Sequence, residues 1–371
     1  MRDRSAVVLA LVLAAGAPLA WAFGSRAGDE GTPPPVAPVT PPPLALLEGA
    51  PEGTESAVVI RHGDGRAVPL GRVPHVAGSA RRGVLLRGGS DPVALVVVQE
   101  RPSRGASTYD SALYRVDARG ARRLVGGLTD ASRPLVTARG TVLVQRGEDG
   151  EDRPLIDRRL RERRDPLTLD AVDPETGAVR TVWRAQGQLA FLACALRGDE
   201  ALVYHLDDTT AALRVLDAST GAVRTLREDL HLARDFSYDR ARDAVVFARA
   251  TGDAAYQVAT ISLQDNALRA LYAAASDHLM PLALGDGRVA LSLPGDRGLG
   301  VLARGEDLPR AVAPLGAGSD AALDARDGWI ALRHTEPDRE RTALLHVARN
   351  ARVVLDDDGL VREVLGFVGA P

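Results

Sequence analysis

Short runs in which apolar residues alternate with other residues, joined in pairs by small turns, dominate this chain. In the clearest pair, one run covers Leu213 to Asp217, the turn ends at Gly221, and the second run covers Ala222 to Leu226. Alternation with a period of two places the apolar side chains on one face of a β-strand. Two such runs joined by a few residues that include glycine predict an antiparallel β-hairpin.

The same hairpin recurs along the chain. The stretch Asp173 to Thr181 (DPETGAVRT) returns as Asp217 to Thr225 (DASTGAVRT), and weaker copies occur on both sides. Glycine and asparagine occupy the turns because both tolerate a positive φ. The seven turns are expected at Gly65, Gly120, Gly177, Gly221, Asn266, Gly305 and Asn350. Successive turns are 39 to 57 residues apart, a spacing that indicates an array of similar units.

Two further short strands separate successive hairpins. The best copy runs from Phe236 to Phe247, and its counterparts are Leu135 to Val144, Leu189 to Tyr204, Met280 to Leu291 and Ala322 to Leu332. Two linking strands and one hairpin give four antiparallel strands per unit, and helical periodicity is almost absent. The sequence therefore predicts an all-β fold, a β-propeller of four-stranded antiparallel blades.

The two ends of the chain predict how the ring closes. Six units between Gly83 and Leu355 each supply four strands, whereas the hairpin Ala57 to Leu70 and the run Val361 to Val368 are incomplete units. Pairing these leftovers would complete a seventh blade and would remove exposed sheet edges. We expect seven blades, with six or eight as the alternatives.

The repeats resemble those of TolB-like, WD-type propellers. Ser237-Tyr238-Asp239 stands where that family often has Ser-Pro-Asp, and Leu128-Thr129 and Pro134 match residues that often precede the strand. The Asp-x-x-Thr-Gly hairpins also resemble those of BamB-like and quinone-cofactor propellers, with Trp183 as the only closing tryptophan in place. The first resemblance implies an extracytoplasmic role in envelope assembly or signalling. For the second we identify no stacking tryptophan in the channel, and we expect no cofactor.

The N-terminal region predicts export. Arg2 and Arg4 precede an apolar run, and Ala20-Trp21-Ala22 is an A-x-A cleavage site, so residues 1–22 are expected to be a signal peptide. An uncleaved anchor over Ser5 to Phe23 is the alternative. Residues 23–55 are expected to be a Pro-rich, disordered linker, and residues 56–371 the propeller. The predicted location is periplasmic or secreted.

Composition excludes several classes of function. The net charge is −3, which argues against a nucleic-acid binder and against a polybasic membrane binder. The chain has one cysteine and no lysine, which excludes an intramolecular disulfide and any P-loop or Schiff-base lysine. No Gly-x-Ser-x-Gly occurs, and the histidines are not at metal-ligand spacing. We therefore expect no catalytic or metal-binding set, and an inert buried thiol at Cys194.

One charged segment interrupts the period and is the candidate partner-binding loop. An acidic half is followed by an arginine-rich half, and insertions in repeat arrays often map to the binding face. The candidate residues are Glu148, Asp149, Glu151, Asp152, Arg158, Arg159, Arg161, Arg163 and Arg164. A partner of mixed charge is one interpretation. A solvated loop that pairs with itself is the other.

The function that these observations favour is a non-catalytic, monomeric scaffold that binds a protein partner. It would touch a membrane only through an uncleaved signal. The alternative is a propeller enzyme of the lactonase, lyase or glycosidase type, with its site at the central channel. Clustered polar residues around a deep pocket at one channel mouth would favour the enzyme, whereas arginine–aspartate pairs there would count against it.

Overall fold

The structure, a computed structural model, describes most of the chain from residue 40 onward. The described ranges are 40–86, 91–101, 111–128, 133–147, 167–185, 189–206, 211–230, 232–252, 255–276, 278–294, 298–312, 318–355 and 359–369. The chain divides into two units, Met1–Pro38 and Val39–Pro371, and all of the described residues belong to the second. Every regular element in these ranges is a β-strand.

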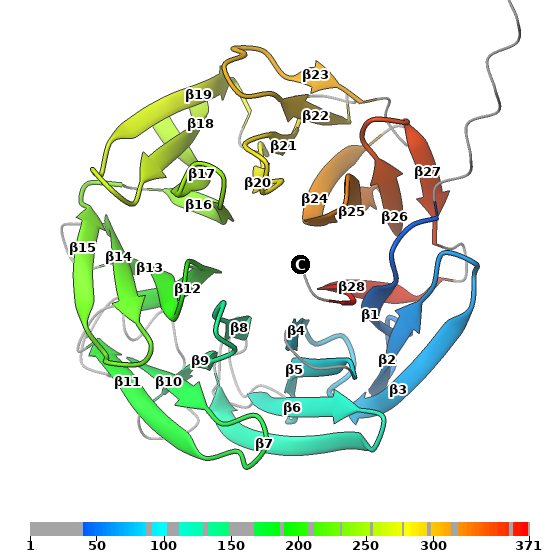
Figure 1. Cartoon of the computed structure of the whole chain (residues 1–371). Helices are drawn as coiled ribbons and strands as arrows, with labels where there is room; N and C mark the ends of the chain where they lie inside the picture. Colours follow the sequence, from blue (N-terminus) through cyan, green and yellow to red (C-terminus); the bar gives the residue numbers. More distant parts are fainter. Residues whose placement is uncertain are drawn as a thin grey trace, which may run out of the picture. The chain divides into compact units, whose positions relative to one another are not determined.

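The strands form five separate four-stranded sheets and one eight-stranded sheet, all antiparallel, arranged as blades around a central axis (Figure 1). The sheet that joins both ends of the chain contains, in order, β28 (Val361–Phe367), β1 (Leu44–Gly49), β2 (Glu55–Arg61) and β3 (Ala67–Pro74). The eight-stranded sheet contains β4 (Arg81–Leu86), β5 (Val93–Gln99), β6 (Ser111–Asp117), β7 (Gly120–Leu128), β8 (Leu135–Val136), β9 (Val142–Gly147), β10 (Leu167–Val172) and β11 (Val179–Ala185). This architecture confirms the predicted propeller of four-stranded antiparallel blades.

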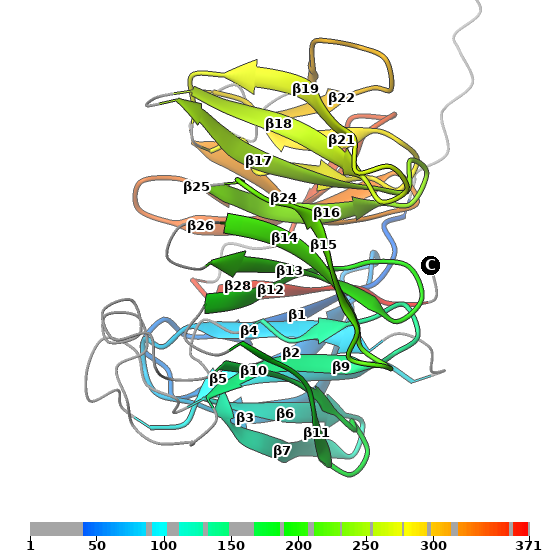
Figure 2. The ribbon, with the colours of Figure 1, turned by 90° about the vertical axis from the view of Figure 1, so that its left-hand side faces the viewer.

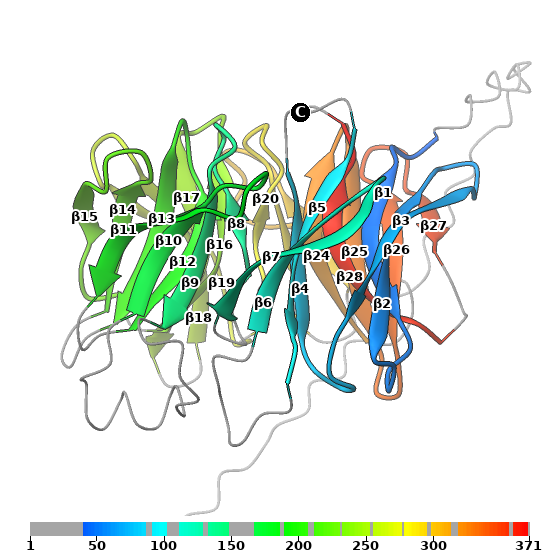
Figure 3. The same cartoon turned by 90° about the horizontal axis from the view of Figure 1, so that it is seen from below.

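The other four sheets each consist of four strands that follow one another in the sequence. Two of them are β12 (Leu189–Ala195), β13 (Glu200–Leu206), β14 (Ala211–Asp217) and β15 (Val223–Arg227), then β16 (Ala233–Asp239), β17 (Ala244–Gly252), β18 (Ala255–Ser262) and β19 (Leu268–Ala274). The last two are β20 (Leu282–Ala283), β21 (Val289–Ser292), β22 (Leu299–Leu302) and β23 (Arg310–Ala311), then β24 (Ser319–Arg326), β25 (Trp329–Thr335), β26 (Glu340–His346) and β27 (Ala351–Val354). Side views show neighbouring sheets face to face (Figures 2 and 3).

The ring is joined through both ends of the chain, as the sequence predicts, but with a different strand. β28 pairs with β1, with Leu44 opposite Phe367 and Gly49 opposite Val361, and β1 in turn pairs with β2. All six residues of β1 are buried. This strand lies inside the range 23–55 that the sequence assigned to a disordered linker, so regular structure begins at Leu44 rather than at residue 56.

The eight-stranded sheet exists because one inner strand is short. β8 has two residues and covers only Val142 and Leu143 on the edge of β9. Farther along the same strand, Arg146 pairs with Leu128, the last residue of β7. This single pair connects the four strands β4 to β7 with the four strands β8 to β11.

The seven predicted turns all adopt the backbone conformation that their residues suggest. Each turn residue has a positive φ, from +48° at Asn350 to +107° at Gly120. In the two best copies, the side chains of Asp173 and Asp217 accept hydrogen bonds from backbone N–H groups of their own turn. An added Cβ at Gly177 would lie 2.8 Å from the Leu124 carbonyl oxygen of the preceding unit. Glycine therefore allows this turn, and the equivalent turn at Gly221, to pack closely against the preceding unit.

The core consists of apolar clusters between adjacent sheets. Phe247 and Leu213 are fully buried between the sheet of β12–β15 and that of β16–β19. Trp329, which is 2% exposed, packs against Leu44 and Leu46 of the closing sheet. Each sheet thus contributes both faces to the core, which accounts for strands that are apolar on both sides. The part of the chain that the structure describes contains no helix long and apolar enough to cross a membrane.

Candidate binding pocket

Charged side chains at one end of the ring connect neighbouring blades. Arg197, in the turn between β12 and β13, forms an ion pair with Asp243, in the turn between β16 and β17, at 2.6 Å. Thr137, after β8, donates a hydrogen bond of 2.6 Å to Asp199, which lies in the same turn as Arg197. The backbone N–H of Phe367 donates to Asp324 at 2.9 Å, which links β28 to β24. These carboxylates are occupied by contacts that hold the ring together.

At the other end of the ring a carboxylate also bridges blades. Glu363, on the inner strand β28, lies 3.4 Å from Arg82 on β4 and 3.1 Å from Arg133 before β8. Arg133 additionally donates to the carbonyl oxygen of Val364 at 3.2 Å. At both ends of the ring, the carboxylates of Asp199, Asp243, Asp324 and Glu363 are therefore engaged in contacts between blades, two of them with arginines.

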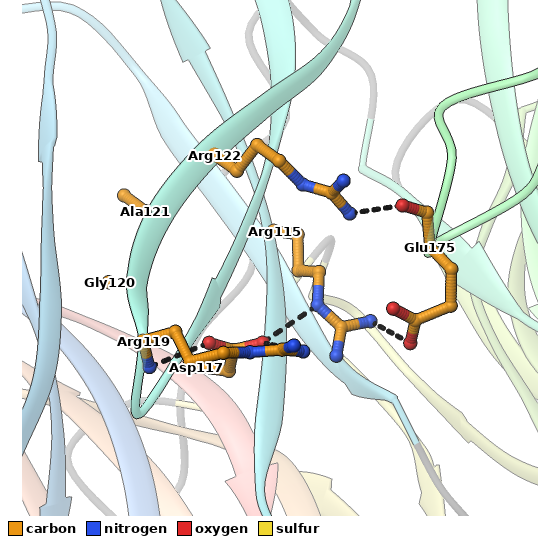
Figure 4. A pocket seen from close by; sticks show the side chains of 7 residues that line it. All are labelled: Arg115, Asp117, Arg119, Gly120, Ala121, Arg122 and Glu175. Carbon is orange, nitrogen blue, oxygen red and sulfur yellow. Dashed lines mark hydrogen bonds and ion pairs between the residues drawn. The ribbon is translucent and has the colours of Figure 1, made fainter.

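A cavity of about 270 Å³ lies away from the channel, at the outer strands β6 and β7. It is formed by the turn between β6 and β7 together with the turn between β10 and β11 (Figure 4). Its lining residues are Arg115, Asp117, Arg119, Gly120, Ala121, Arg122 and Glu175. Three guanidinium groups and two carboxylates therefore converge at the junction of two repeats.

Arg115 is the buried centre of this pocket. Its side chain is 7% exposed, and its Nε donates to Asp117 Oδ2 at 2.9 Å. Its Nη1 donates to Glu175 Oε1 at 2.6 Å and to the Pro174 carbonyl oxygen at 3.3 Å. β6 thus presents Arg115 to the turn of the next unit, and Glu175, which is 63% exposed, reaches back to meet it.

The two other arginines have separate roles in the turns. Arg119 donates from its backbone N–H to Asp117 Oδ1 at 2.8 Å and from Nη2 to Asp117 Oδ2 at 3.3 Å. Arg122 Nη2 donates to the carbonyl oxygens of Pro174 and Glu175. Arg119 therefore closes its own hairpin, whereas Arg122 holds the neighbouring one.

Asp117 should contribute to stability in a pH-dependent way. Burial raises its pKa, but hydrogen bonds from Arg115 and Arg119 outweigh this effect and lower the pKa to about 2. Because the folded-state pKa lies below the unfolded value of about 3.9, the stabilisation is complete above that value and is lost as the pH falls towards 2. We expect Asp117→Asn to lower the free energy of unfolding at pH 7 by about 1 kcal/mol.

Urea denaturation of both proteins between pH 7 and pH 3 measures this effect. The difference between wild type and Asp117→Asn should shrink as the pH falls. Asp327→Asn is a suitable control because the side chain of Asp327 is 77% exposed, and it should change the free energy of unfolding less at every pH. A difference for Asp117→Asn that grows towards acid would contradict the role of the arginines.

The partner-binding loop predicted from the sequence lies outside the described residues. All nine of its candidate residues, from Glu148 to Arg164, fall between the end of β9 at Gly147 and the start of β10 at Leu167. Its role in binding stays a prediction. The pocket is a different feature, because it is formed by the turns β6–β7 and β10–β11.

His75, His334 and the cysteine take part in contacts within the fold. His334 is buried and contacts Asp320 at 2.7 Å, and His75 contacts Ser56 at 2.8 Å. No group of three or more metal-ligating side chains gathers among the described residues. Cys194 is partly buried rather than fully buried as the sequence predicts, but it packs against an apolar cluster, and desolvation raises the pKa of its thiol to about 12.

The pocket gives no continuous signal in the sequence, because its two halves are far apart in the chain. Arg115 and Glu175 meet only when two hairpins pack side by side. One signal was present: Arg115 lies two residues before Asp117, whereas Ala171 and Val215 lie two residues before Asp173 and Asp217. A charged residue at a position that is apolar in two better copies marks a departure from the repeat.

Comparison with known proteins supports the fold. No protein family and no curated protein matches the sequence. Among solved structures, a puromycin-hydrolysing peptidase from Mycobacterium tuberculosis matches with a TM-score of 0.58 and 15% identity, over 84% of this chain and 53% of that chain. The β-propeller domain of the Trilobed protease from Pyrococcus furiosus matches with a TM-score of 0.53 and 11% identity, over 86% of this chain and 96% of that chain.

TolB from Acinetobacter baumannii is also matched, with a TM-score of 0.48 and 10% identity, over 85% of this chain and 82% of that chain. The chain spans about half the length of the peptidases that it matches. Likeness at such low identity shows the fold alone. The predicted likeness to propeller proteins is confirmed as a likeness of fold by the match to the propeller domain of the Trilobed protease.

Proposed function

We propose that this chain is an exported, non-catalytic β-propeller that binds a protein partner as a scaffold. One observation carries the proposal. Carboxylates described at both ends of the ring are paired with arginines of a neighbouring blade, Asp243 with Arg197 and Glu363 with Arg82 and Arg133. Such pairs neutralise and immobilise the groups that a channel enzyme would need free for acid–base chemistry. The location, periplasmic or secreted, follows from the signal peptide that the N-terminal residues predict.

We further infer that the ring has seven blades. The eight-stranded sheet contains two successive sets of four strands, and the single pair Leu128–Arg146 joins them. Each set carries one of the positive-φ hairpins, at Gly120 and Gly177. If each set is counted as one blade, the two sets and the five four-stranded sheets add up to seven blades.

Crosslinking in intact cells followed by affinity purification of the tagged full-length protein tests the proposed function. We expect a stoichiometric partner in the mass spectrum of the envelope or secreted fraction. Deletion of residues 148–164 should remove the partner if the charged loop supplies the contact. Arg72→Ala is the control, because Arg72 lies on β3 with a side chain 71% exposed, and it should retain the partner.

The absence of a partner above background in both fractions would overturn the scaffold proposal. The lactonase, lyase and glycosidase activities of the alternative would then be assayed with the same purified protein. Turnover that survives deletion of residues 148–164 would favour a site at the channel.

A further inference from the structure

We propose that the pocket between the β6–β7 and β10–β11 turns binds a carboxylate of a partner polypeptide, which displaces Glu175 from Arg115. The proposal rests on the proposed protein-binding function and names the chemistry that one contact would use. Two features of the pocket support it: arginine N–H donors that are not used, and the exposed carboxylate of Glu175, which can be displaced. A comparison with the equivalent junction one repeat later gives further support.

The pocket has spare hydrogen-bond donors. A guanidinium carries five N–H donors, and Arg115 uses only Nε and Nη1 for the contacts that the described residues make with it. Its Nη2 makes no hydrogen bond with those residues, and the dashed lines from Arg115 in Figure 4 start at its two other nitrogens. Although the side chain as a whole is 93% buried, this nitrogen is not sealed from solvent, so an oxygen of a ligand in the cavity can reach it.

The neighbouring arginines add donors of the same kind. In their contacts with described residues, the side chains of Arg119 and Arg122 each donate only from Nη2. The lining therefore offers guanidinium donors, while both of its carboxylates are already bonded to arginine. A planar oxyanion is the ligand that such donors bind best, because a guanidinium can bind it in a bidentate manner.

Glu175 occupies the position that we assign to the ligand. Its Oε1 accepts from Arg115 at 2.6 Å, yet its side chain is 63% exposed, whereas that of Asp117 is 10% exposed. Only the Glu175 side of this pair is exposed, and Arg115 keeps its contact with Asp117, so a carboxylate that replaces Glu175 leaves Arg115 paired as before. When Glu175 turns outward, three guanidinium groups face the single carboxylate of Asp117.

The equivalent junction one repeat later shows which contacts only hold the turns together. There, Arg180 Nη2 donates to the Ala218 carbonyl oxygen at 2.8 Å, as Arg122 does to Pro174 and Glu175. Gly221 also approaches the Val182 carbonyl oxygen as Gly177 approaches that of Leu124. The packing of the turns is therefore the same at both junctions.

Arg115 and Glu175 have no charged counterparts at that second junction. Ala171 and Ser219 take their places, counted from Asp173 and Asp217. Two turns can therefore pack in this geometry without the Arg115–Glu175 pair. The pair is thus available for binding, and the second junction supplies substitutions that the packing already accepts.

A carboxylate on a polypeptide fits the position of the pocket. The turns that form it lie on the outer strands, where a chain can approach from solvent, and about 270 Å³ accommodates the end of one acidic side chain rather than a large ligand. Free inorganic phosphate shares the oxyanion chemistry, so the experiment includes it as a separate arm.

Fluorescence anisotropy of a labelled hexaglutamate peptide with the full-length protein at low salt tests the proposal. We expect the wild-type protein to bind the hexaglutamate peptide and not to bind a hexaglutamine peptide. Arg115→Ala, which copies Ala171, should weaken binding about tenfold, the equivalent of about 1.4 kcal/mol. Glu175→Ser, which copies Ser219, should strengthen it severalfold by removing the competing carboxylate. Arg180→Ala is the matched control and should bind as wild type does.

Circular dichroism and thermal unfolding of each variant separate loss of the site from loss of the fold. Equal weakening by Arg115→Ala and Arg180→Ala in folded proteins would indicate nonspecific attraction and would overturn the proposal, as would no binding by wild type. Phosphate that competes at micromolar concentration, with the same dependence on Arg115, would overturn the polypeptide as the source of the oxyanion.

Failure of this inference can be told apart from failure of the proposed function. A crosslinked partner that Arg115→Ala retains in full would overturn the pocket as its contact while the scaffold function stands. Peptide binding that depends on Arg115 would support the pocket even where the crosslinking experiment finds no cellular partner.

Discussion

Removal of residues 1–50 is expected to abolish cooperative folding of the ring, whereas removal of residues 1–39 is expected to leave the ring folded. The longer truncation deletes β1, whose Leu44, Leu46 and Leu47 are at most 2% exposed. Burial of each such side chain contributes about 1.5–3 kcal/mol. Their combined loss is comparable with the total stability of a typical domain, about 5–15 kcal/mol.

The deletion also removes the backbone partner of two strands. β28 and β2 both pair with β1, so the longer truncation separates them and exposes two sheet edges. Circular dichroism during heating and analytical centrifugation of the two truncated proteins measure the effect. The same melting temperature for both would show that β1 contributes little to the ring.

The second large effect is expected for Glu48→Ala, which should lower the free energy of unfolding by about 3–5 kcal/mol. Glu48 is 6% exposed and bonds to Arg362 at 3.0 Å and to Arg61 at 2.9 Å. The side chain of Arg362 is only 2% exposed, so removal of the carboxylate takes a close counterion away from a buried positive charge. Urea denaturation at neutral pH measures the change.

Glu55→Ala is the control for this variant. Glu55 begins β2 in the same sheet and pairs with Arg72, but the two side chains are 47% and 71% exposed, so the loss should stay below about 1 kcal/mol. A double variant, Glu48→Leu with Arg362→Met, should recover much of the loss because both of the most buried charges are removed, whereas Arg61 is 24% exposed. Similar losses for Glu48→Ala and Glu55→Ala would contradict the importance of burial.

The repeat itself could be predicted from the sequence because its signals are local. The Asp-x-x-Thr-Gly turns need only their own residues: Asp173 accepts the backbone N–H groups of Glu175 and Thr176, and Gly177 takes the positive φ. The alternation of the flanking strands is equally local. These features therefore identified the blades without any knowledge of what packs against them.

The first strand escaped prediction for a physical reason. Leu44–Gly49 is buried on both faces, so it lacks the alternation that identifies a half-exposed strand, and it directly follows the proline-rich stretch. Its partner, β28, lies at the other end of the chain. Pairing at such separation leaves no mark in the local pattern.

The pocket could not be predicted because it depends on the angle between two neighbouring repeats. Arg115 and Glu175 each look like ordinary surface charges in their own hairpins. Only the packing of Gly177 against Leu124 brings the second turn within reach of Arg115. An alignment of the copies against one another could have shown the unusual arginine, although not the residue that it meets.

The pairing of β1 with β28 also sets the order in which the ring can be completed. β1 precedes all other described strands during synthesis, and the strand that covers its free edge comes last. Bringing such distant segments together has a large entropic cost, which is typical of slow folding. Until that step, the edge of β1 stays open to other chains, and a chaperone that covers it would raise the yield of folded protein.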